Sequence, residues 1–156
     1  MPLPQDRLTK LIHEDELEEQ LAYEMERARR YEWDLGMVLV EPVLPDTVGQ
    51  DMLYAALKKL AIVCSSTMRV VDRGIRWGSG IFYILPETPP EGVEVAARKI
   101  QEQFEDTYLD HPVSGEPFKC TVRKATRVYS GKAAKENPAG EVDRKELLHQ
   151  LRDDMG

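Results

Sequence analysis

The glycine-rich turn Gly78-Ser79-Gly80 is the segment of this chain that most suggests a chemical function. Backbone N–H groups in such a turn, with a serine hydroxyl beside them, can cradle a phosphate group. The turn itself contains no acid, no base and no metal ligand. It could therefore be an active site, a former active site or only a connection between two strands.

Other reactive residue types are scattered along the chain. His13, His111 and His149 have no serine or cysteine nucleophile beside them in a recognisable motif, so we expect no catalytic triad. Cys64 and Cys120 have no second cysteine or histidine close in sequence, as metal ligands usually have. We expect two buried, reduced thiols, no metal ion and no other cofactor.

The composition is that of a soluble globular protein. A length of 156 residues suits a single domain over 1–156, with 1–5 and 153–156 expected as loose ends. The 21 basic and 28 acidic residues give a net charge of -7, which argues against a nucleic-acid polymer or an anionic membrane as partner. Because the chain shows no signal segment and no long apolar run, we expect a cytoplasmic protein.

Apolar residues that recur every three or four positions predict four amphipathic helices. These helices cover 14–31, 50–66, a segment that begins after Thr88, and 146–154. Thr88 is expected to be the N-cap of its helix, because prolines follow it and Glu91 stands three residues further on. The acids of the first helix are expected to form a solvated face, and 130–143 a polar loop.

Three apolar patterns predict the strands. The continuous run 35–40 indicates a central strand that is buried on both faces. Val70-Val71 and 81–85 flank the glycine turn and predict a hairpin, while alternation from Phe118 predicts a strand that runs toward Tyr129. This order of elements predicts an α/β (α+β) sandwich, in which helices flank a central mixed sheet.

Within this order of elements, three motifs resemble the GGDEF domain, the fold of the diguanylate cyclases. The segment Asp6-Arg7-Leu8-Thr9-Lys10-Leu11 resembles the D-x-L-T-G-L signature, with Lys10 in the place of glycine. The hairpin 76–82 resembles the signature hairpin, and the ILPET segment 84–88 is typical of the residues that the family places after that hairpin. The resemblance runs from about Asp6 to the last helix, and it implies a nucleotidyl-cyclase-like palm and a role in bacterial cyclic di-GMP signalling.

The same resemblance implies a degenerate signature. An active member joins two GTP molecules and needs acids that hold magnesium, two of them in a turn that reads G-G-[DE]-E-F. Here the turn reads Gly78-Ser79-Gly80-Ile81-Phe82, so Gly80 and Ile81 stand where the carboxylates should be. An alignment shifted by one residue puts Ser79 and Gly80 there, again without a charge. We therefore predict no catalytic residue and no enzyme activity.

The first-strand acid of the family appears as Glu41, which is followed by Pro42. Between Glu41 and Asp51, the match to the end of the family's G-H-x-x-G-D segment, the chain is several residues too short. The missing loop is the one that would hold the guanine of GTP. We expect Glu41 and Asp51 to cap or to meet solvent rather than to bind metal.

The segment Arg69-Val70-Val71-Asp72 precedes Gly78 at the spacing at which the family places R-x-x-D, its inhibitory site for cyclic di-GMP. An arginine can donate twice to a guanine, and a carboxylate can accept from the opposite edge of a base. In the family a basic residue on the next helix completes the site. Lys99 and Arg98 fall there, with Lys99 favoured by position, although lysine lacks the arginine fork. The alternative is that Arg69 and Asp72 form a surface ion pair of little consequence.

The resemblance leads to one preferred interpretation and two others. The preferred one is a catalytically inactive GGDEF-like domain that acts as a cyclic di-GMP receptor or signalling adaptor. The alternative is a protein-interaction scaffold that binds no nucleotide. A residual GTP-binding or cyclase enzyme is the least favoured. We expect a protein partner, and the sequence leaves a homodimer open.

Overall fold

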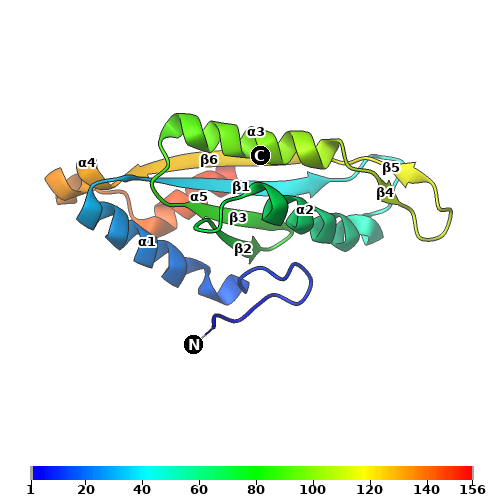
Figure 1. Cartoon of the computed structure of the whole chain (residues 1–156), viewed down its shortest axis with the longest axis horizontal. Helices are drawn as coiled ribbons and strands as arrows, with labels where there is room; N and C mark the ends of the chain where they lie inside the picture. The colour runs from blue at the N-terminus through cyan, green and yellow to red at the C-terminus, as the bar shows by residue number, and fades with distance from the viewer. Residues whose placement is uncertain (1, 156) are drawn as a thin grey trace.

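The computed structural model describes residues 2–155 (Figure 1). Its helices are α1 (Leu17–Tyr31), α2 (Leu53–Thr67), α3 (Pro90–Glu105), α4 (Gly131–Glu136) and α5 (Arg144–Asp154). Its strands are β1 (Asp34–Val43), β2 (Arg73–Trp77), β3 (Gly80–Leu85), β4 (Leu109–Asp110), β5 (Pro117–Phe118) and β6 (Thr121–Ser130). Three short 3-10 helices are η1 (Glu14–Glu16), η2 (Gln50–Met52) and η3 (Pro138–Gly140).

The central sheet has the strand order β2-β3-β1-β6, and every ladder between these strands is antiparallel. The sheet is therefore antiparallel, which corrects the prediction of a mixed sheet. Each helical crossover joins two parallel strands that have a third strand between them, so parallel strands are never neighbours. Parallel pairing among residues 2–155 is confined to one isolated bridge, between Ile12 and Ile75.

Helices flank the central sheet (Figure 1), and an apolar cluster lies on each of its two faces. Val38 and Val40 of β1 pack with α2 and α3, whereas Met37 and Leu39 pack with α1 and α5. All four side chains are fully buried, which confirms the prediction of a central strand covered on both faces. No helix within residues 2–155 is long and apolar enough to cross a bilayer.

The segment Val70-Val71, expected in a strand, lies instead in a loop between α2 and β2. Val70 is fully exposed and Val71 is 58% exposed. The loop is closed by a hydrogen bond from the N atom of Asp72 to the O atom of Arg69, and β2 begins only at Arg73. The β-propensity of the valines is therefore overridden by this turn.

The polar stretch expected as a loop over 130–143 contains two short helices, α4 and η3. Ser130 begins α4 by accepting a hydrogen bond from the N atom of Ala133 at 3.1 Å. The arm formed by β4 and β5 was not expected either. Of the expected loose ends, Gln5 pairs with Ile12 and Asp153 lies in α5, while residues 1 and 156 lie outside the described residues.

Candidate functional site

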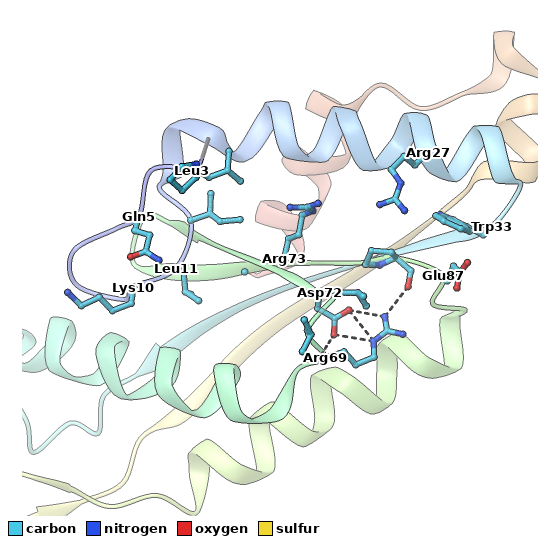
Figure 2. Close-up of a pocket in the computed structure, with 16 residues that line it drawn as sticks. Leu3, Gln5, Lys10, Leu11, Arg27, Trp33, Arg69, Asp72, Arg73 and Glu87 are labelled. Atoms are coloured by element: carbon cyan, nitrogen blue, oxygen red, sulfur yellow. Dashed lines mark hydrogen bonds and ion pairs between the residues drawn. The ribbon is translucent and has the colours of Figure 1, made fainter.

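Arg69 and Asp72 form an ion pair in the loop that follows α2 (Figure 2). The N atom of Arg69 donates to Oδ2 of Asp72 at 2.8 Å, and Nη2 of Arg69 donates to Oδ1 at 2.8 Å. The side chain of Asp72 is only 2% exposed, whereas that of Arg69 is 52% exposed. The pair is therefore anchored by a buried carboxylate and presents its cation to solvent.

The guanidinium of Arg69 is also bonded to the loop between β3 and α3. Its Nη2 atom donates to the O atom of Pro86 at 2.9 Å and to Oγ1 of Thr88 at 2.7 Å. Within residues 2–155, no hydrogen bond engages Nη1 of Arg69. Arg69 thus joins two loops and keeps one donor atom uncommitted.

Two hollows border the Arg69–Asp72 pair. The larger pocket, of about 650 Å³, lies against the N-terminal segment and α1 (Figure 2). Its lining includes four cations and one tryptophan: Lys10, Arg27, Arg69, Arg73 and Trp33. The smaller pocket, of about 290 Å³, lies between the end of α2 and the first half of α3. Arg69, Asp72 and Glu87 line both pockets, so each pocket combines cationic and acidic side chains at the same pair.

The structure separates the two candidates for the completing basic residue. Lys99 lines the smaller pocket together with Arg69 and Asp72. Arg98 is 59% exposed and lies beside Glu102 of its own helix, with 3.8 Å between Nε and Oε1. Of the two, the structure therefore brings Lys99 to the Arg69–Asp72 pair. That these residues bind a ligand stays a prediction.

A buried acid beside this site was not predicted. Glu24 of α1 is fully buried and accepts hydrogen bonds from Nη1 of Arg27 at 3.0 Å and from Nε of Arg73 at 3.1 Å. The expectation that the acids of this helix form a solvated face is therefore wrong at Glu24. Its spacing from Leu21 and Ala28, both on the buried face, was the available signal.

Both main-chain polar atoms of Gly78 are engaged within the protein. The N atom of Gly78, which has a φ of +60°, donates to the carboxylate of Glu14. The O atom of Gly78 accepts from Nε of Arg76 at 3.1 Å. The N–H group of Gly78, one of those that could have cradled a phosphate, is thus occupied by a glutamate side chain.

Glu41 faces the same turn from β1. It accepts a hydrogen bond from Oγ of Ser79 at 2.9 Å and pairs with Arg152 of α5, with 3.3 Å between Oε1 and Nη1. A Cβ atom added to Gly80 would lie 2.6 Å from Cγ of Glu41, so the turn packs directly on this carboxylate. We expected Glu41 to act as a cap or to meet solvent. Instead, its side chain forms an ion pair with Arg152.

The rest of the hairpin is core or is covered. Ile81 and Phe82 are fully buried, and the Trp77 ring packs edge-on against Phe82 with 5.8 Å between centroids. Among residues 2–155, no three histidine, cysteine or acidic side chains gather in a way that could hold a metal ion. Cys64 is buried as predicted, and burial raises the pKa of its thiol to about 12.

The segment that resembles D-x-L-T-G-L is a hydrogen-bonded turn. Oδ2 of Asp6 accepts from the N and Oγ1 atoms of Thr9 at 2.8 Å each, and Oδ1 accepts from Nη1 of Arg76 at 3.1 Å. Burial acts to raise the pKa of Asp6, but these hydrogen bonds outweigh it and hold the pKa below its ordinary value. Lys10 has a φ of +64°, the left-handed region that favours glycine.

Comparison with known proteins agrees with this geometry. The model of the family described as "Diguanylate cyclase, GGDEF domain" matches residues 4–138. Among curated proteins none matches this chain.

Solved structures share the fold. The diguanylate cyclase SiaD of Pseudomonas aeruginosa, solved with its activator SiaC, has a TM-score of 0.80 and 19% identity, over 97% of this chain and 56% of that chain. The FimX GGDEF domain of Pseudomonas aeruginosa has a TM-score of 0.80 and 11% identity, over 97% of this chain and 90% of that one. DgcB of Caulobacter crescentus, solved with c-di-GMP, has a TM-score of 0.71 and 16% identity, over 88% and 82%.

This chain therefore spans little more than half of the SiaD chain that it matches. At such identities the structural likeness shows the fold alone, and it confirms the predicted GGDEF-like palm. The family model covers most of the chain, from the Asp6 turn through the sheet. The chain belongs to the GGDEF family.

Proposed function

We propose that this GGDEF domain does not synthesise cyclic di-GMP but binds it at Arg69, and that it works as a receptor or signalling adaptor in the bacterial cytoplasm. One observation carries the proposal. Arg69 is anchored by the buried carboxylate of Asp72, while its Nη1 atom has no hydrogen-bond partner within residues 2–155. An anchored guanidinium with a free donor is suited to the acceptor atoms of a guanine.

The surroundings of Arg69 fit an anionic nucleotide. Lys99 lies in the smaller pocket and can donate to a phosphate oxygen, although a lysine contributes less specificity than an arginine fork. Asp72 pairs with Arg69 and holds the guanidinium in place. DgcB, which shares the fold, was solved with c-di-GMP, and this supports the choice of ligand.

The absence of cyclase activity is part of the same proposal. Magnesium requires several oxygen ligands, and carboxylates beside the triphosphate usually supply them. In this chain Gly80 and Ile81, which begin β3 directly after the turn, carry no carboxylate, and the nearby carboxylate of Glu41 is paired with Arg152 and Ser79. These contacts support a turn that serves as a packed junction.

Calorimetric titration with cyclic di-GMP tests the binding. Wild type should bind, and Arg69→Ala should raise Kd at least about tenfold, because a hydrogen bond to a charged group contributes about 1.5–3 kcal/mol. Arg98→Ala is the matched control, since Arg98 lies on the exposed face of α3, and it should leave Kd unchanged. If the wild type releases or absorbs no binding heat, or if Arg69→Ala has an unchanged Kd, the receptor function is wrong.

Incubation with GTP and magnesium tests the lack of synthesis. We expect chromatography to detect no cyclic di-GMP after prolonged incubation. Clear turnover would overturn the argument from Gly80 and Ile81.

A second candidate is a protein-interaction scaffold that binds no nucleotide. The observation that favours it is the exposure of Val70 and Val71 beside Arg69, since exposed apolar side chains are common in partner surfaces. SiaD was solved with an activator protein, which fits such a use of the fold. A folded wild type that gives no heat with cyclic di-GMP would favour this candidate over the receptor.

A further inference from the structure

We propose that Thr88 is a positioning residue, which holds the guanidinium of Arg69 in the orientation that a ligand needs. This inference rests on the proposed function at Arg69. Thr88 was expected to be the N-cap of α3, but the N-cap position belongs to Pro89 and no side chain caps that helix. The Thr88 hydroxyl is therefore available for another purpose.

Three contacts fix Thr88 in place. Its N atom donates to the O atom of Asp34 at 3.0 Å, which ties it to the start of β1. Its Oγ1 atom donates to the O atom of Pro86 at 2.9 Å. Its methyl group lies where a Cβ atom on Gly92 would approach to 2.9 Å, so only the missing side chain of Gly92 leaves room for it. The residue is 6% exposed and has little freedom to turn.

The chemistry of the hydroxyl follows from these contacts. A threonine hydroxyl has one hydrogen and two lone pairs. Because the hydrogen is directed to Pro86, the oxygen can only accept, and Nη2 of Arg69 donates to it at 2.7 Å. Thr88 is therefore a fixed acceptor that is matched to one nitrogen of the guanidinium.

The guanidinium is planar, so fixing one side of it orients the other side. Asp72 holds Nε and Nη2, and Pro86 and Thr88 hold Nη2 again. Nη1 then points away from these anchors. The side-chain entropy of Arg69 is lost when the protein folds rather than when a ligand binds, and such preorganisation raises affinity.

A series of variants at Thr88 tests the role of the hydroxyl. Thr88→Val keeps the shape but removes the acceptor, and it should raise the Kd for cyclic di-GMP about tenfold, the effect of one lost hydrogen bond of ordinary strength. Thr88→Ser keeps the hydroxyl and should stay within about threefold of wild type. Thr121→Val, at an exposed position of β6, is the matched control and should bind as wild type does.

A second readout does not depend on the ligand. In arginine side-chain NMR, the Arg69 guanidinium should show slow rotation in wild type and in Thr88→Ser, and faster rotation in Thr88→Val. If wild type does not bind cyclic di-GMP, the proposed function fails, and the NMR comparison still decides whether Thr88 positions Arg69. Equal rotation of the Arg69 guanidinium in wild type, Thr88→Val and Thr88→Ser would overturn the inference. An equal Kd in all three proteins would overturn it too. So would an equal rise in Kd in the valine and serine variants.

Gly92→Ala provides an independent test, because it removes no polar group. The added methyl crowds Thr88, so we expect weaker binding and faster rotation of Arg69. Alanine also favours helix over glycine, so α3 itself should not be weakened. Binding and rotation equal to those of wild type would contradict the proposed fixing of Thr88.

Discussion

The guanidinium of Arg152 lies 4.4 Å from the centroid of the Trp77 ring, while its Nη1 atom lies 3.3 Å from Oε1 of Glu41. One cation of α5 therefore joins the end of β2 to β1. The side chain of Glu41 is 16% exposed, so it depends on Arg152 and Ser79 for compensation of its charge.

Arg152→Ala should lower the free energy of unfolding by about 1–2 kcal/mol, through loss of the stacking on Trp77 and of the ion pair. The loss should be no larger because the side chain of Arg152 is 34% exposed. Urea denaturation measures the effect. Arg98→Ala removes an exposed pair and should change stability by less than about 0.5 kcal/mol. Equal losses in the two variants would show that the Arg152 contacts are not stabilising.

Lys10→Gly should make the protein more stable than Lys10→Ala by about 0.5–1 kcal/mol. Lys10 has a φ of +64°, a conformation that costs any residue with a Cβ atom about 1–2 kcal/mol. Glycine relieves this strain but loses more entropy on folding, so only part of the gain remains. Thermal unfolding of the two variants provides the comparison, and an alanine variant as stable as the glycine variant would contradict it.

The stability contributed by Asp6 should depend on pH. The pKa of Asp6 is lowered in the folded state, so its contribution is fully present above the ordinary pKa of 3.8 and is lost as pH falls through the folded pKa. The difference in stability between wild type and Asp6→Asn should therefore be largest near neutral pH and shrink below about pH 4. Urea denaturation at a series of pH values measures it. A difference that stays constant down to pH 2 would exclude this linkage.

Glu24→Gln should destabilise the protein by about 2 kcal/mol. The substitution leaves Arg27 and Arg73 beside a neutral group, and breaking a buried ion pair from one side is usually costly. Both arginines are about one third exposed, which limits the loss. Glu19→Gln, at an exposed position of the same helix, is the control and should cost less than about 0.5 kcal/mol. Similar losses in the two variants would mean that the burial of Glu24 is without consequence.

Those elements whose signal is local could be predicted from the sequence. The strand around Val38 and the helix that begins near Leu17 follow from apolar periodicity, which depends only on neighbours along the chain. The Arg69 loop could not be predicted in the same way. Its shape depends on Pro86 and Thr88, which lie two strands and a turn later in the chain. The strand propensity of Val70 favoured a strand at this position instead.

The same limit applies to the site. R-x-x-D spacing indicated Arg69 and Asp72 because a family pattern places them, and the structure brings Lys99 beside them. Thr88 was singled out for another task, since a threonine before proline is a common helix cap. Only its three-dimensional surroundings show which partner its hydroxyl has.

The turn at Gly78 is contacted from both ends of the chain. Glu14 reaches it from the first helical turn, and Arg152 reaches its flank from the last helix. If either terminal segment opens, the same three-residue turn loses a partner, so the two segments should fray together rather than separately. We therefore expect the first and last helical segments to open as one cooperative unit, although most of the chain lies between them.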